Sequence, residues 1–102
     1  MKESCRIYLD EQFGGDADIV AEIYKEYVTS VGAKLSEADS ALAAGEWDAI
    51  DKIAHAIKGN SLTAGDNEMA SIAIDLRNAA KLQDGGHASE LISRLKELFA
   101  TL

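Results

Sequence analysis

The spacing of apolar residues along this chain predicts an all-helical protein. Apolar side chains recur every three or four residues over most of its length, which places them on one side of a helix. No segment alternates apolar and polar residues with the period of two that marks a half-buried strand. The chain also contains no proline, the residue that most strongly interrupts helices.

Glycines divide this pattern into five segments. Asp16 or Asp18 is placed to cap the second helix, and Asp66 to cap the fourth. His87 or Ala88 is the expected start of the fifth. The expected elements are a short helix over about 3–13 and four longer helices over about 16–44, 46–63, 66–82 and 87–102.

Four amphipathic helices joined by short turns pack as antiparallel neighbours. We therefore expect an up-down-up-down four-helix bundle, with the short N-terminal helix covering one end. At 102 residues the chain is long enough for one hydrophobic core, so a single domain over 1–102 is expected. The bundle itself would occupy about 16–102.

The charge and cysteine content of the chain limit the kinds of partner and compartment that suit it. The net charge of −8 argues against nucleic acid and anionic membranes, which attract basic surfaces. Cys5 is the only cysteine and cannot form an internal disulfide, and no segment reads as a signal peptide or a membrane span. We expect a cytoplasmic monomer, and the short ends of the chain favour a free-standing protein.

One histidine stands apart from the burial pattern. On the third helix the apolar stripe contains Ile50, Ile53 and Ile57, with Trp47 at its edge. At 100° per residue, His55 points about 150° away from the middle of that stripe. Burial alone does not explain a histidine there, and a neutral imidazole nitrogen is a nucleophile.

The residues that share this face suit an approaching partner. Gly59, one turn after His55, leaves a flat surface at the cost of about 1 kcal/mol of helix propensity. Leu62 extends that surface with an apolar side chain. Lys58 can reach a phosphoryl group on the ring, and Asp51 can accept a hydrogen bond from a ring nitrogen or pair with Lys58.

The motif His55-x-x-Lys58-Gly59-x-Ser61-x-x-x-Gly65 resembles that of histidine-containing phosphotransfer (HPt) domains. The resemblance covers about residues 16–102. Two positions depart from the family pattern, Arg77 in place of an acidic residue and Asp66 in place of a small one. Neither is expected to touch the histidine face.

The resemblance implies a phosphorelay intermediate in two-component signalling. His55 would accept a phosphoryl group, on Nε2, from a receiver-domain aspartate and pass it to another receiver. Lys58 would stabilise the phosphoryl charge, while Asp51, Gly59 and Leu62 would form the docking face. Ser61 and Gly65 would be structural members of the motif. The implied partners are response-regulator receivers, a hybrid sensor histidine kinase, or both, and Mg²⁺ would come from the receiver.

Other functions remain open at this level. A histidine kinase could phosphorylate the domain directly, or the bundle could be a non-catalytic interaction module. The chain has no nucleotide-binding glycine loop, so ATP-dependent activity of its own is not expected.

The other candidate residues point to no second site. A zinc site on His55 and His87 lacks further ligands, and Cys5 has no base beside it. His87 reads as a cap or a surface residue, and Tyr24, Tyr27 and Trp47 read as aromatics of the core or of its edge.

Overall fold

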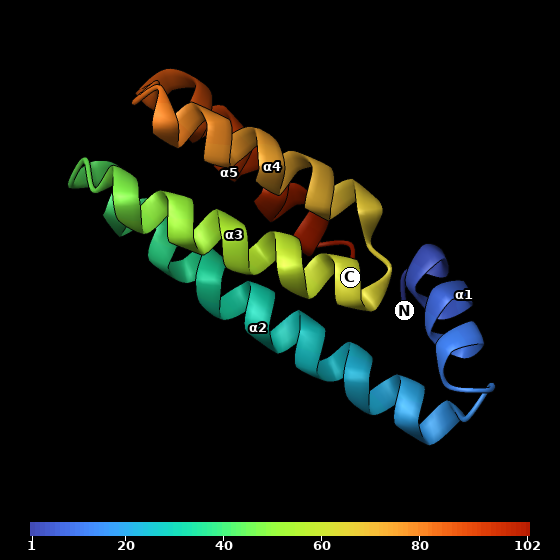
Figure 1. Ribbon diagram of the computed structural model, residues 1–102. Coiled ribbons are helices and arrows are strands. Elements are labelled where there is room, and N and C mark those ends of the chain that lie inside the picture. Colours follow the sequence, from blue (N-terminus) through green and yellow to red (C-terminus); the bar gives the residue numbers. More distant parts are fainter.

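The computed structural model describes residues 1–102 and contains five helices and no strand. It confirms the expected fold, a four-helix bundle preceded by a short N-terminal helix (Figure 1). No helix is both long and apolar enough to cross a membrane. The helices are α1 (Glu3–Gln12), α2 (Ala17–Ala43), α3 (Trp47–Ala64), α4 (Asn67–Lys81) and α5 (Gly85–Phe99).

The bundle is elongated, with extents of 43 × 20 × 18 Å. Each of its helices packs against the next one along the chain, and α5 closes the bundle by packing against α2. The helix α1 lies across one end, against α2 and α3 (Figure 1). The side chains of Cys5 and Leu9 on α1 are fully buried and join the same hydrophobic core as the bundle. The short helix is therefore part of the core.

Aspartates begin three of the helices. Asp16 accepts hydrogen bonds from two backbone N–H groups of α2, and Asp66 accepts one from Met69 in α4, as the sequence predicts. Asp84 caps α5 in the same way by accepting from the N–H of His87. The prediction that α5 begins at His87 or Ala88 is therefore wrong. The Asp84 cap fixes the first turn, so the helix starts at Gly85, two residues earlier.

The end of α3 depends on a glycine. Gly65 has a φ of +77°, in the left-handed region that glycine adopts without a steric penalty. A Cβ atom there would lie only 2.4 Å from the Cβ of Tyr8. The absent side chain thus lets α1 pack directly against the C-terminal end of α3.

Candidate functional site

His55 lies in the middle of α3 with its side chain exposed. The residues that face the other way on this helix, among them Ile53, Ala54 and Ile57, are buried against the bundle. The amphipathic pattern of α3 therefore holds the ring on the outside of a helix whose inner side is fixed by packing.

The imidazole contacts a residue on the neighbouring helix. Nη1 of Arg77, from α4, lies 3.0 Å from Nδ1 of His55. The expectation that Arg77 does not touch the histidine face is therefore wrong. The apolar pattern of α4 could have predicted this contact. Arg77 directly follows the buried Leu76 and so lies at the margin of the apolar stripe that packs against α3. Nε2 of His55 has no hydrogen-bond partner within the chain.

Arg77 also binds Asp51, one turn before His55 on α3. Its Nε donates to Oδ1 of Asp51 at 2.9 Å. This hydrogen bond lowers the pKa of the Asp51 carboxyl below its ordinary value. Asp51 therefore pairs with neither Lys58 nor the ring, the two hydrogen-bonding roles that the sequence suggests for it. It holds the guanidinium that faces the ring.

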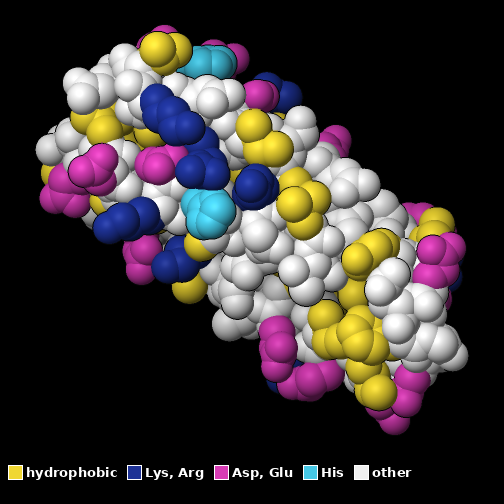
Figure 2. Space-filling model, in the orientation of Figure 1, with side chains coloured by type: hydrophobic (Ala, Val, Ile, Leu, Met, Phe, Trp, Pro, Cys, Tyr) yellow, Lys and Arg dark blue, Asp and Glu magenta, His cyan; other side chains and the backbone are white.

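Cations gather around His55 on a protein whose net charge is −8. Lys52 and Lys58 lie three residues before and after it on α3, within one helical turn on either side. Lys81 follows Arg77 by one turn on α4, and its charge also acts on Asp51. Figure 2 shows Lys and Arg side chains clustered about a histidine over α3 and α4. We call Lys52, Lys58, Arg77 and Lys81 the basic cluster.

The remaining surface residues of the motif leave the ring accessible. Gly59 is exposed, and a Cβ atom placed there would meet no other group within 4 Å. Leu62, one turn further along α3, is 48% exposed although it is apolar. Lys58 is half-buried and forms no ion pair. An approaching group would meet an open helix surface between the ring and Leu62.

Ser61 and Gly65 lie away from this surface. Ser61 is fully buried, and its hydroxyl donates to the Ile57 carbonyl oxygen at 2.6 Å. Gly65 ends α3 beneath Tyr8. Both are placed where they determine helix packing, at a distance from the exposed face that His55 occupies.

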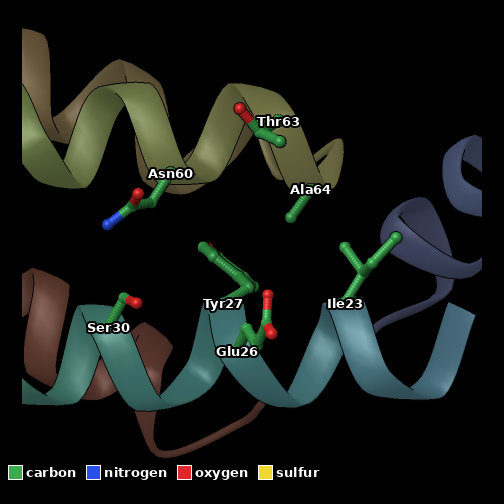
Figure 3. A pocket seen from close by; sticks show the side chains of 7 residues that line it. All are labelled: Ile23, Glu26, Tyr27, Ser30, Asn60, Thr63 and Ala64. Atoms are coloured by element: carbon green, nitrogen blue, oxygen red, sulfur yellow. The ribbon is translucent and has the colours of Figure 1, made fainter. Parts of the chain in front are cut away.

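The other candidate residues do not converge on His55. His87 is exposed in the first turn of α5, and burial raises the pKa of the Cys5 thiol. No group of three or more His, Cys, Asp or Glu side chains is arranged to hold a metal ion. A separate hollow lies between α2 and α3 and contains no residue of the site (Figure 3). It is lined by Ile23, Glu26, Tyr27, Ser30, Asn60, Thr63 and Ala64.

Comparison with known proteins shows the family to which this chain belongs. A family model described as "Hpt domain" matches residues 22–102, which include His55 and the basic cluster. The chain therefore belongs to the Hpt domain family. Proteins of this family carry out phosphotransfer in two-component signalling and interact with receiver domains and kinases. Neither the search of curated proteins nor that of solved structures gave a significant match.

Proposed function

We propose that this protein is a phosphorelay intermediate whose phosphorylated residue is His55. The observation that carries the proposal is the position of the exposed His55 inside the basic cluster of an acidic protein. Phosphoryl groups are anionic, so cations around an accessible nucleophile favour their binding. His87, the other histidine, has no comparable set of lysines and arginines beside it in the sequence.

The reaction joins a receiver aspartyl phosphate to the ring. The lone pair of Nε2 attacks phosphorus while the bond from phosphorus to the aspartate oxygen breaks, and its electron pair returns to the carboxylate. The receiver's Mg²⁺ would offset charge on the transferring group. Donation to a second receiver is the reverse reaction. Lys58 is the cation of the motif whose ammonium group is available to pair with the phosphoryl group, because it forms no ion pair within the chain.

The receiver would dock over α2 and α3 beside His55. A shallow groove there contains small apolar residues, which permit close approach, and charged side chains at its margins. Its lining is Lys34, Glu37, Ser40, Ala41, Ala44, Glu46, Ala49, Lys52 and Ile53. Lys52 belongs both to this groove and to the basic cluster, so the two surfaces are continuous. Gly59 and Leu62 continue the docking face on the other side of the ring. We further propose that the protein acts as a cytoplasmic monomer.

Phosphoryl transfer from a panel of aspartyl-phosphorylated receivers tests the proposal. We expect acid-labile, alkali-stable label on the wild-type protein and on His87→Gln, and none on His55→Gln. Because His55 is exposed, its replacement should leave the free energy of unfolding nearly unchanged.

The donor distinguishes this function from its alternatives. Label obtained only with a histidine kinase and ATP would indicate a domain phosphorylated directly by a kinase. Absence of label with every receiver and kinase, while binding persists, would indicate an interaction module. Label that remains on His55→Gln would overturn the assignment of the histidine.

A further inference from the structure

Chemistry fixes which group donates the hydrogen bond between Arg77 and His55. A guanidinium group carries five N–H donors and no acceptor. Its Nη1 lies 3.0 Å from Nδ1 of the ring, so Nδ1 must be the acceptor in this hydrogen bond. A neutral imidazole has one donor and one acceptor nitrogen. The proton of the neutral ring is therefore assigned to Nε2, from the identity of its partner.

Arg77 is held in this position from its other side. Its Nε donates to Asp51 at 2.9 Å, and the Arg77 side chain is only 27% exposed. Asp51 and His55 lie one turn apart on α3, so the guanidinium from α4 bridges two successive turns of the same face. The other charged groups around the ring are Asp48, Lys52 and Lys58 on α3 and Lys81 on α4.

Donation from Arg77 to Nδ1 suits the phosphorylated ring better than the tautomer of the ring that attacks phosphorus. An Nε2 that carries a proton has no lone pair with which to attack phosphorus. Attack from Nε2 needs the other tautomer, with the proton on Nδ1, and Arg77 cannot accept that proton. Once phosphorus is bonded to Nε2 and the proton on Nδ1 has been released to water, Nδ1 has a lone pair and Arg77 can donate to it without conflict.

We propose that Arg77 is a positioning residue that slows phosphorylation of His55 and preserves the phosphohistidine. The inference rests on the proposed function of His55. In hydrolysis, a water oxygen bonds to phosphorus, the P–Nε2 bond breaks, and its electron pair goes to Nε2. A proton on Nδ1 assists this step because the leaving group is then neutral imidazole instead of imidazolate. The Arg77 hydrogen bond occupies the lone pair that this proton would take.

The tautomer can be measured without any signalling partner. In ¹⁵N-labelled protein, the ring nitrogen shifts of His55 should show a protonated Nε2 and an unprotonated Nδ1. In Arg77→Gln, the population of the Nδ1–H tautomer should increase, because glutamine can also accept a hydrogen bond. Arg94→Gln, an exposed arginine on α5, is the matched control and should leave the His55 signals unchanged. A wild-type ring protonated on Nδ1, or identical shifts in Arg77→Gln, would overturn the proposal.

The stability of the phosphohistidine gives a second test. Phosphoramidate, a small phosphoryl donor, is used to load the proteins, and ³¹P NMR follows the loss of the phosphohistidine signal. We expect Arg77→Gln to load faster and to lose the group about fivefold faster, the scale of one hydrogen bond. Arg77→Lys keeps a donor and should restore most of the lifetime, and Arg94→Gln should match the wild type. Equal lifetimes for Arg77→Gln and the wild type would contradict the inference.

The two proposals fail in different ways. If His55 is not a relay residue, receivers transfer no label to it, yet the tautomer and the lifetime after loading with phosphoramidate still depend on Arg77. If the inference about Arg77 is wrong, receivers label His55 normally and the tautomer is insensitive to the substitution. Circular dichroism of each variant shows whether the bundle is intact.

Discussion

The Tyr27 hydroxyl donates a hydrogen bond to a carboxylate oxygen of Asp66 at 2.7 Å, and both side chains are buried. Burial raises the pKa of Tyr27 far above its ordinary value, so the phenol keeps the proton that it donates. The other carboxylate oxygen accepts from the ammonium group of Lys2 at 2.7 Å and from the backbone N–H of Met69. In this fold Asp66 therefore joins the N-terminal segment, α2 and α4.

Removing the phenol tests this buried network. We expect Tyr27→Phe to lower the free energy of unfolding by about 1–2 kcal/mol, because Asp66 loses one of its donors but keeps two. Asp66→Ala should cost about 3 kcal/mol or more, since it removes the cap of α4, the short hydrogen bond of the buried Tyr27 hydroxyl and one of the two carboxylates that pair with Lys2. Urea unfolding followed by circular dichroism measures both values. A Tyr27→Phe protein as stable as the wild type would show that the hydrogen bond contributes nothing.

The attachment of the N-terminal helix can be followed through Cys5, whose side chain is fully buried. Burial alone would lower the pKa of Lys2, but its hydrogen bonds to Asp66 and Glu68 raise it above the ordinary value. We expect Lys2→Met to increase the rate at which a thiol reagent labels Cys5, because this pairing holds the segment before α1. Lys96→Met, which removes a surface pair with Asp39, is the control and should leave the rate unchanged. Equal labelling of all three proteins would show that Lys2 does not hold α1.

Substitutions at two glycines with positive φ distinguish the energetic cost of backbone strain from that of a steric clash. Gly45 and Gly65 both have left-handed φ angles, but only a Cβ on Gly65 would collide with Tyr8. Gly45→Ala should cost about 1 kcal/mol from the backbone alone. Gly65→Ala should cost at least about 2 kcal/mol, because α1 must also move. Comparison of their urea midpoints tests this, and equal losses would show that the contact with Tyr8 adds nothing.

Gly59 provides the complementary case, in which a side chain meets open space. Gly59→Ala should raise the free energy of unfolding by about 0.5–1 kcal/mol through helix propensity. Gly59→Leu should also keep the fold intact, yet slow phosphoryl transfer from a receiver by occupying the approach to His55. Transfer rates for both variants are compared with the wild type. A leucine variant that transfers at the wild-type rate would show that the glycine does not serve access.

The bond between Arg77 and Asp51 predicts a specific acid response. Because it lowers the pKa of Asp51, the pair stabilises the fold at neutral pH, and this stabilisation is lost as the pH falls through the lowered value. In Arg77→Gln, the titration midpoint of the Asp51 carboxyl, followed by ¹³C NMR, should move upward. Arg94→Gln should not change it. An unchanged midpoint in Arg77→Gln would contradict the ion pair.

Much of the fold follows from the sequence because its signals are local. The period of apolar residues, the glycines and the capping aspartates act within a few residues of one another, and they predicted the helices and the bundle. The sequence pattern places the start of α5 too late because Gly85 and Gly86 read as a turn. Both glycines lie in the helix because the Asp84 side chain satisfies the N–H of His87. The exact end of a helix depends on single side-chain hydrogen bonds of this kind, and the spacing of apolar residues does not predict them.

The sequence by itself determined that His55 stands on the polar face of α3, because the helical period and the composition of that face place it there. Only the tertiary structure decided what the ring contacts. The packing of α4 on α3 brings Arg77 within 3.0 Å of Nδ1 although the two residues are separated by 22 positions in the chain. The packing of α2 on α3 likewise brings Tyr27 beside the buried Asp66, 39 positions away. Contacts between helices depend on their relative rotation and separation, which side-chain packing fixes and the helical period alone does not specify.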